Sequence, residues 1–366
     1  MHYHQWVAFC EQVGMLRLRG KARFAHLSAP LSMTIFPRHD SPIQLPKFPV
    51  NLRYCSLLFC GGRLNDYLLS LILGIVEGLT EYLPVSSTAH LRLSEALLHV
   101  SGLAPNLTLD NGYWKMYSIV IQLGAILCLP VYFWGRIRRF LSTFPAGESG
   151  RRTALTHPLG LTAVAFVVTA IPSFLLTKVI GKHLENIVIM GWSLLIGGIV
   201  MWLIDALNAK SEAAGPGAPG SRIRTWKMED MSLAQAVWIG FCQIFSAVFP
   251  GTSRSMSTIG GGQIVGMSRA AALEFSFFVS MPTMAAATLY TLLKSLSGKG
   301  ENPIGVSQID AHGWIVLAIG FVVSFIVAYG SVAWFMAYVR RRGFAPFAVY
   351  RIILGVVVLV YAARLS

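Results

Sequence analysis

Two glutamates lie four residues apart, directly after an apolar stretch that has the composition of a membrane helix. Residues 68–76 are apolar apart from one serine, and Glu77 and Glu81 follow. Side chains at positions i and i+4 share one face of a helix, so we expect the two carboxylates to lie side by side. An acidic group at the bilayer centre costs about 2.5 to 3.5 kcal/mol, which favours a functional role. The pair suits a divalent cation with oxygen ligands, magnesium or calcium. The alternative is that both glutamates lie near a helix end and reach water.

The helix is expected to break immediately after the two glutamates. Pro84 is followed by the hydroxyl side chains of Ser86, Ser87 and Thr88, and His90 comes next. Proline interrupts a helix because it lacks the backbone N–H. Ser87 is a candidate nucleophile if His90 activates it, and His90 or a carboxylate could transfer protons. The alternative is that these hydroxyls only cap the short helix that follows, which is their commoner role.

A second polar run, at residues 250–258, has the composition of a phosphate site. Gly251 allows a tight turn, and successive backbone amides beside hydroxyl groups form an anion-binding nest. Arg254 has a planar guanidinium that can donate to two phosphate oxygens. The alternative is that Arg254 forms an ion pair with Glu77 or Glu81. The expected phosphate-binding residues are Gly251, Thr252, Ser253, Arg254, Ser255 and Thr258.

The composition of the whole chain places these motifs in a membrane protein. Of the 366 residues, 54% are hydrophobic and 13% are charged, whereas a soluble domain has about 25% charged residues. The net charge of +14 is concentrated before the first apolar segment and in short loops, which is how membrane topology is encoded. No nucleic-acid motif accompanies this charge, so we expect no nucleic-acid partner. The five scattered cysteines predict neither a disulfide framework nor a zinc site.

The sequence divides into an extension and one membrane domain. Residues 1–63 are basic and rich in proline, and we expect them to be disordered or to result from a start codon assigned too far upstream. Residues 64–366 are expected to form a single domain with two halves, 64–204 and 233–366. The linker between the halves, 205–232, contains a Gly-Pro-rich stretch that cannot be helical.

Apolar segments of nearly 20 residues predict about six full transmembrane helices. They lie at residues 114–133, 155–176, 187–203, 270–293, 315–338 and 347–362. The three glycines at 260–262 predict a turn.

Charge in the loops determines how the remaining segments cross the membrane. The Arg-rich loop 134–153 and the arginines 340–342 fall on the cytoplasmic side together only if 64–99 and 233–265 are re-entrant hairpins. The two hairpins then enter from opposite faces. The sequence thus predicts an all-α polytopic membrane protein, an inverted repeat whose two broken-helix hairpins meet near the bilayer midplane.

A short internal match supports the repeat. When residues 74–87 are placed over 240–253, a glycine, a Glu/Gln pair, a proline and a closing serine coincide at one constant offset.

These motifs resemble those of the undecaprenyl-diphosphate phosphatase family, the bacitracin-resistance type. The family's E-x-x-x-E signature matches Glu77 and Glu81, and its P-G-x-S-R-S-x-x-T signature matches residues 250–258. The stretches 121–124 and 274–277 are also similar to the family. The resemblance extends from about residue 65 to the carboxyl end.

The resemblance implies a metal-dependent enzyme of the bacterial inner membrane. Such an enzyme hydrolyses undecaprenyl diphosphate to undecaprenyl phosphate and inorganic phosphate, which recycles the lipid carrier for peptidoglycan synthesis and confers bacitracin resistance. Catalysis on the periplasmic side is implied, with the polyprenyl tail among membrane lipids, and either Ser87 or a metal-activated water as the attacking group. A homo-oligomer is left open. The residues that carry over are Glu77, Glu81, Ser87, His90, Ser253, Arg254 and Thr258.

Three features depart from the family pattern. Ala89 stands where the family has glycine, Met256 and Ser257 replace Gly-Ala, and residues 1–63 have no counterpart.

A transporter or lipid-phosphate flippase is the alternative function. Inverted repeats with broken helices also serve alternating access, and the glutamate pair could couple to a cation. The anion-binding chemistry around Arg254, next to the two carboxylates, favours hydrolysis over cation exchange. A membrane scaffold without chemistry would leave the buried charges unexplained.

Overall fold

Six long apolar helices account for most of the structure. The computed structural model describes residues 64–109, 112–148, 150–176, 186–297 and 309–365, so the predictions made for residues 1–63 lie outside it. The described residues contain no strand, and their six helices that are long and apolar enough to cross a membrane confirm the predicted number. They are α5 (Gly112–Tyr132), α7 (Pro158–Leu175), α9 (Ile187–Ala214), α12 (Arg269–Leu296), α13 (Ala311–Arg342) and α14 (Ala345–Leu365).

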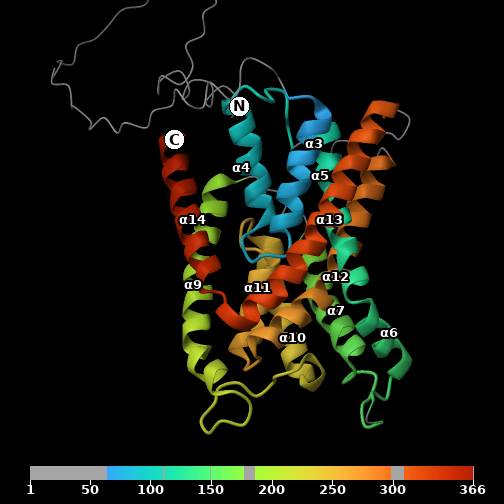
Figure 1. The fold of residues 1–366 in the computed structure, drawn as a ribbon, viewed down its shortest axis with the longest axis vertical. Helices are drawn as coiled ribbons and strands as arrows, with labels where there is room; N and C mark the ends of the chain where they lie inside the picture. Colours follow the sequence, from blue (N-terminus) through green and yellow to red (C-terminus); the bar gives the residue numbers. More distant parts are fainter. Residues whose placement is uncertain (1–63, 110–111, 149, 177–185, 298–308, 366) are drawn as a thin grey trace, which may run out of the picture. The chain divides into compact units, whose positions relative to one another are not determined.

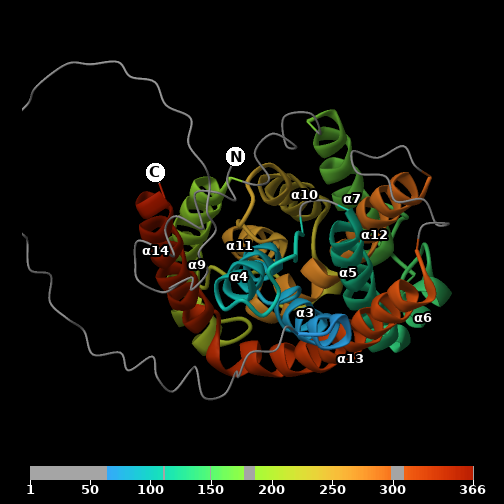
Figure 2. The same cartoon turned by 90° about the horizontal axis from the view of Figure 1, so that it is seen from above.

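The other apolar segments form two pairs of helices, each interrupted by a break, and we call them the first and the second hairpin. The first consists of α3 (Asp66–Thr80) and α4 (Ser87–Val100), and the second of α10 (Leu233–Val248) and α11 (Arg254–Ile264). Figure 1 shows the first hairpin descending from the upper end of the bundle and the second rising from the lower end. Seen from above, α3, α4 and α11 are surrounded by the long helices (Figure 2). The hairpin tips therefore meet in the interior of the bundle.

Each hairpin packs on a helix of the other half through a glycine. In the first hairpin, a Cβ on Gly74 would lie 3.0 Å from the carbonyl oxygen of Gly320 in α13. In the second, a Cβ on Gly240 would lie 2.6 Å from the carbonyl oxygen of Ala165 in α7. Gly74 and Gly240 are the glycines that coincide in the sequence repeat. The two halves thus contain the same kind of helix contact, once at Gly74 and once at Gly240. Glycine is needed at both positions because it allows the helices to approach closely.

Two charged segments contain more helix than the sequence predicts. Helix α9 continues to Ala214, ten residues into the predicted linker 205–232. It does so because Asp205 is buried and accepts from Arg269 Nε at 2.7 Å and from Phe344 N at 3.1 Å, so packing extends past the membrane span. A short helix, α6 (Trp134–Thr143), lies in the predicted Arg-rich loop.

The three glycines at 260–262 lie inside α11, whereas the sequence predicts a turn. They are used for close packing. A Cβ on Gly261 would lie 2.9 Å from Cys242 Sγ of α10, and a Cβ on Gly262 would lie 2.9 Å from Ala272 Cβ of α12. All three glycines are buried, so tertiary contact overrides their low helix propensity.

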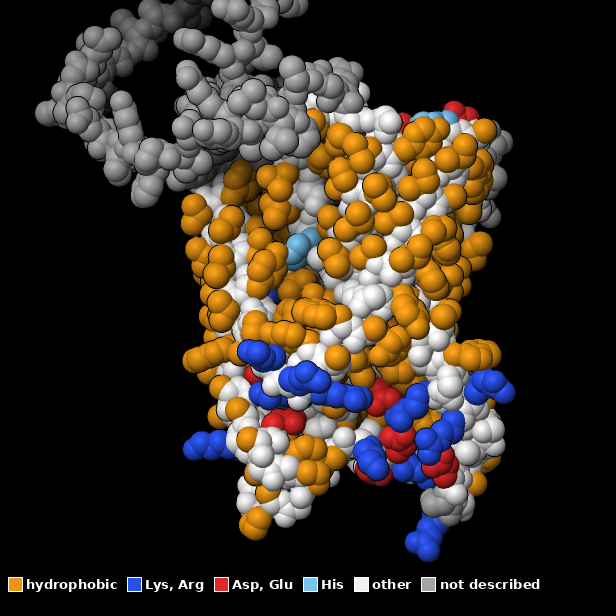
Figure 3. All heavy atoms as spheres, viewed as in Figure 1, with side chains coloured by type: hydrophobic (Ala, Val, Ile, Leu, Met, Phe, Trp, Pro, Cys, Tyr) orange, Lys and Arg blue, Asp and Glu red, His pale blue; other side chains and the backbone are white. Residues whose placement is uncertain are grey.

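The surface of the described residues has an apolar band and a strongly charged lower end (Figure 3). Figure 3 shows lysine, arginine and acidic side chains gathered at the lower end, below a band of hydrophobic side chains. Many large hydrophobic side chains of the described residues are strongly exposed, including Leu175 at 75% and Leu293 at 66%. At the charged end, Arg136 forms ion pairs with Glu229 at 3.1 Å and with Glu274 at 2.5 Å. The apolar band identifies a multi-pass membrane protein.

Candidate active site

Both hairpins turn at a serine with an unusual backbone conformation. Ser86 has φ 74° and Ser253 has φ 69°, and no other described residue except glycine has a positive φ. Such a conformation costs on the order of 1–3 kcal/mol and is concentrated at functional turns. Each serine caps the next helix, since Ser86 Oγ accepts from Ala89 N and Ser253 Oγ from Met256 N. The structural counterpart of Ser253 is therefore Ser86, one residue before the Ser87 that the sequence repeat pairs with it.

The two short helices begin at the centre of the bundle. Helix α4 starts at Ser87 and α11 starts at Arg254, so each of these helices begins at the tip of its hairpin (Figure 1). A helix amino terminus carries a partial positive charge and unpaired N–H groups, which favour an anion. Two such ends near one another create a local environment suited to a phosphate group.

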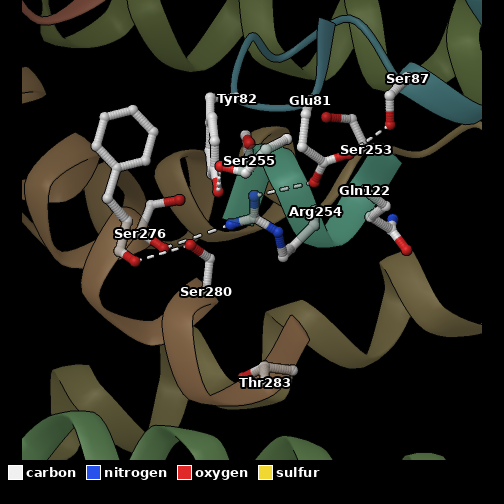
Figure 4. Close-up of polar contacts among 12 residues, drawn as sticks. Glu81, Tyr82, Ser87, Gln122, Ser253, Arg254, Ser255, Ser276, Ser280 and Thr283 are labelled. Carbon is white, nitrogen blue, oxygen red and sulfur yellow. Dashed lines mark hydrogen bonds and ion pairs between the residues drawn. The ribbon is translucent and has the colours of Figure 1, made fainter. Parts of the chain in front are cut away.

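Ser87, Glu81 and Arg254 form a connected polar group. Ser87 Oγ donates to Glu81 Oε2 at 2.6 Å. The other carboxylate oxygen, Glu81 Oε1, lies 3.6 Å from Arg254 Nη2. Figure 4 shows the three side chains pointing toward one another from both hairpins. The structure thus brings the two sequence motifs together and gives Ser87 a carboxylate to accept its proton.

Arg254 keeps free hydrogen-bond donors although it is nearly buried. Its Nη1 donates to the Ser276 carbonyl at 3.4 Å, and its guanidinium lies 5.7 Å from the Tyr82 ring centroid. Its Nε and Nη2 are buried and have no hydrogen-bond partner among the described residues. The contact with Glu81 is too long for a hydrogen bond. The ion pair with Glu81 therefore does not occupy all the donors of Arg254, and the remaining donors suit an oxyanion.

Glu77 lies beside a small polar cavity. Its side chain is 1% exposed, and its Oε2 has no hydrogen-bond partner among the described residues. The cavity has a volume of about 160 Å³ and lies among α3, α4 and α5, with Ser87, Thr88, Ser118 and Gln122 among its lining residues. An uncompensated buried carboxylate is costly, so the arrangement suits a cation.

His90 makes its hydrogen-bond contacts with residues other than Ser87. Its Nδ1 lies 2.7 Å from the Ser86 carbonyl oxygen and its Nε2 lies 2.6 Å from the Tyr350 hydroxyl of α14. The rings of His90 and Tyr350 also stack, with 5.6 Å between centroids. Both ring nitrogens are thus occupied, and the proton acceptor that contacts Ser87 is Glu81 rather than His90.

The remaining residues of the second motif differ in their surroundings. Ser255 Oγ is buried and has no hydrogen-bond partner among the described residues. Thr258 is fully buried and bonds Ser276 Oγ at 2.6 Å and the Arg254 carbonyl at 2.9 Å, so it orders the start of α11. Gly251 and Thr252 form the turn itself, and Gly251 has φ 86°.

Arg351 connects the two hairpin tips, and the sequence motifs do not include it. It is a fully buried residue of α14. Its Nη1 donates to the Pro84 carbonyl at 3.1 Å in the first hairpin. Its Nη2 lies within donating distance of the carbonyls of Gly251, at 3.1 Å, and Thr252, at 2.9 Å, in the second. An arginine in the middle of an apolar segment is itself a signal of function, and that signal was available in the sequence.

The fold defines a multi-pass helical membrane protein, and its two hairpin tips enclose a buried polar group with charges of both signs. Residues 70–357 match the family described as bacitracin resistance protein BacA. The chain belongs to this family.

Several curated relatives carry the name undecaprenyl-diphosphatase. The protein of this name from Koribacter versatilis (strain Ellin345) is 62% identical over 303 residues, which cover 82% of this chain and 100% of the relative. The one from Sorangium cellulosum (strain So ce56) is 42% identical over 293 residues, covering 79% of this chain and 84% of the relative. The one from Deinococcus radiodurans is 36% identical over 299 residues, covering 82% and 96%.

Proposed function

We propose that this chain is a phosphatase that hydrolyses undecaprenyl diphosphate to undecaprenyl phosphate and inorganic phosphate, and thereby recycles the lipid carrier and confers bacitracin resistance. The family and the relatives' names support this activity. The observation that carries it is the contact of Ser87, Glu81 and Arg254, which combines a hydroxyl, a proton acceptor and an anion-binding guanidinium in one buried place.

The geometry supports a direct attack by Ser87. Ser87 Oγ would form a bond to the terminal phosphorus while its proton passes to Glu81 Oε2, 2.6 Å away. The bond from that phosphorus to the bridging oxygen would break, and undecaprenyl phosphate would leave. Water would then hydrolyse the phosphoserine and release inorganic phosphate. Arg254 Nε and Nη2, with the amino-terminal N–H groups of α11, would hold the terminal phosphate throughout.

The two glutamates fit a divalent cation. Glu77 Oε2 has no partner among the described residues, and Ser87 and Gln122 line the same cavity, so the donors are the hard oxygens that magnesium and calcium prefer. No group of three or more His, Cys, Asp or Glu side chains suited to a metal occurs in the described part of the chain. Glu77 and Glu81 are the carboxylates that would hold such a cation. The cation would neutralise part of the negative charge of the diphosphate.

The position of the cavity supports an opening toward the periplasm of the bacterial inner membrane. The cavity beside Glu77 lies in the first hairpin, which descends from the end opposite the charged loops (Figures 1 and 3). The positive-inside rule places the Arg-rich end, which includes residues 136–139 and 340–342, in the cytoplasm. The polyprenyl tail would extend between helices into the surrounding lipid.

Phosphate release from undecaprenyl diphosphate by the full chain in detergent tests the proposal. We expect Arg254→Ala to lower kcat/KM by about 10²- to 10³-fold, because the guanidinium stabilises charge that develops on the phosphate. Arg138→Ala, at an exposed position in the charged end, is the matched control and should keep full activity. Absence of release from well-folded wild-type protein would refute the phosphatase, and transport of lipid phosphate in liposomes would then be measured.

Removal of divalent cations should reduce phosphate release to the background rate, and added magnesium should restore it. A second measurement does not depend on activity: magnesium should raise the thermal unfolding temperature of the wild type, because a ligand that binds only the folded state stabilises it. Glu77→Gln should lose this increase, whereas Glu229→Gln, the same change at the charged end, should keep it. Equal rates of release with and without chelator would rule out the cation.

A further inference from the structure

A second, larger pocket lies at the charged end of the bundle. It has a volume of about 580 Å³ and is formed by the carboxyl-terminal part of α9, the end of α11 and residues 221–224 of the connection between the halves. Gln263, which lines it, follows Arg254 by nine residues along α11, or about 14 Å at 1.5 Å per residue. The pocket is therefore separate from the candidate active site. Its volume is within the range of small-molecule sites.

Two arginines without acidic partners lie at this pocket. Arg222 and Arg224 line it, are exposed, and form no ion pair among the described residues. Other arginines at the same end do have acidic partners, as Arg136 has Glu229 and Glu274. The pocket thus has an uncompensated positive charge, which attracts an anion.

The backbone holds these arginines in place. Arg222 N donates to Ser211 Oγ of α9 at 3.1 Å, and Arg224 N donates to the Gly266 carbonyl at 2.8 Å. The segment is further attached where Ser268 N donates to the Thr225 carbonyl at 2.8 Å. A backbone that is attached at three points keeps Arg222 and Arg224 at the pocket, so binding a ligand requires no further ordering of this segment's backbone.

A buried donor without a partner completes the polar side of the pocket. Gln263 is 3% exposed, and its Nε2 has no hydrogen-bond partner among the described residues. An unpaired amide donor in the interior is destabilising unless a ligand or water accepts from it. Gln263 lines the same pocket as Arg222 and Arg224, so an oxygen-rich anion bound there would have all three residues as neighbours.

Part of the pocket wall is apolar and exposed. Leu207 of α9 is 57% exposed and Ile264 of α11 is 56% exposed, and Ile204 and Val265 also contribute. Exposed apolar side chains beside arginines form a surface for an amphiphile, because the chain can cover the apolar wall while the head group contacts the cations. Free phosphate would leave this wall uncovered.

We propose that this pocket binds the phosphate group of an anionic membrane lipid, with the lipid chain against Leu207 and Ile264. The phosphate accepts from the guanidinium groups of Arg222 and Arg224 and from Gln263 Nε2. The site lies at the end of the bundle that the positive-inside rule assigns to the cytoplasm. It does not depend on the phosphatase activity.

Native mass spectrometry of the full chain in detergent micelles tests this site. The probe is dioleoyl phosphatidylglycerol, with phosphatidylcholine and sodium phosphate as separate arms. We expect Arg222→Gln combined with Arg224→Gln to lower phosphatidylglycerol binding by about tenfold or more, because charge-assisted hydrogen bonds are lost. Arg138→Gln combined with Arg151→Gln removes the same charge from exposed positions at the same end and should bind as the wild type does.

A substitution of the buried donor provides the second test. Gln263→Met keeps the side-chain length and removes the unpaired amide, so it should weaken phosphatidylglycerol binding without lowering the unfolding temperature. All variants should keep wild-type phosphate release. Equal loss of lipid in both arginine pairs would mean unspecific attraction and would overturn the site. So would binding of phosphatidylcholine as strong as that of phosphatidylglycerol, or displacement of the lipid by millimolar inorganic phosphate.

Discussion

Ser87→Ala is expected to lower kcat for phosphate release on the order of 10⁴-fold, because it removes the attacking oxygen while leaving Arg254 and the helix amino termini in place. The hydroxyl of Ser87 is the one that donates to Glu81, at 2.6 Å. The matched control is Thr88→Ala, which removes a hydroxyl from the next residue in the same cavity and should cost less than tenfold. Acid quenching of the wild type during turnover should trap phosphoserine at position 87, identified by peptide mass spectrometry.

The combination of Ser87→Ala with Glu81→Gln tests whether the two residues act as a unit. A base and the nucleophile that it activates give strongly non-additive losses, since either change alone disables the same step. The double variant should therefore be no slower than the slower single variant. If Ser87→Ala keeps a tenth of wild-type kcat while Glu81→Gln does not, the attacking group is water activated by Glu81, and the serine attack is wrong.

The elements that cross the membrane could be predicted from the sequence because their determinants are local. Hydropathy gives the six spans, and Pro84 and Pro250 indicate where the hairpins break. Loop charge predicts in addition that the two hairpins enter from opposite faces. The extension of α9 to Ala214 could not be predicted in this way, because it depends on Asp205 meeting Arg269 from a distant helix.

The site shows the same division between local and tertiary information. The two motifs identify Glu81 and Arg254, and the inverted repeat predicts that they lie close together. In the structure Glu81 Oε1 lies 3.6 Å from Arg254 Nη2. The group that accepts the hydrogen bond of the Ser87 hydroxyl depends on the direction in which side chains point after the break between α3 and α4. The positive φ at Ser86 turns the chain so that Ser87 reaches Glu81, while His90 reaches Tyr350 of α14. A short sequence spacing, such as that between Ser87 and His90, does not determine this direction.

Arg351 shows why the two motifs alone are an incomplete description of the site. The strained turns at Ser86 and Ser253 require support from outside the hairpins. Arg351 provides it, because one guanidinium donates to carbonyls of both tips, those of Pro84 and Thr252 among them. Since the two hairpins carry different catalytic groups, the distance between those groups depends on this connection. Arg351 is therefore a positioning residue.

Substitutions of Arg351 should affect activity and stability separately. Arg351→Lys keeps the charge, but a single ammonium cannot reach carbonyls of both tips as the planar guanidinium does, so we expect kcat to fall by about 10²-fold with a small change in KM. Arg351→Leu removes the donor groups that contact the carbonyls of Pro84, Ser193, Gly251 and Thr252, the last three of which share the two hydrogens of Nη2. At about 1–3 kcal/mol for each lost N–H donor, the loss is a large part of the free energy of unfolding of a typical protein.

Thermal unfolding in detergent, measured together with steady-state kinetics, distinguishes these effects. Arg351→Leu should unfold at a far lower temperature or fail to accumulate, whereas Arg341→Leu, at an exposed position of α13, should behave as the wild type does. Arg351→Lys should remain folded and bind substrate with a nearly normal KM while losing kcat. This combination is expected only if the guanidinium sets the distance between the hairpins, since a purely structural role would lower the unfolding temperature and kcat together. Normal kcat in a folded Arg351→Lys protein would show that the hairpins hold their positions without it.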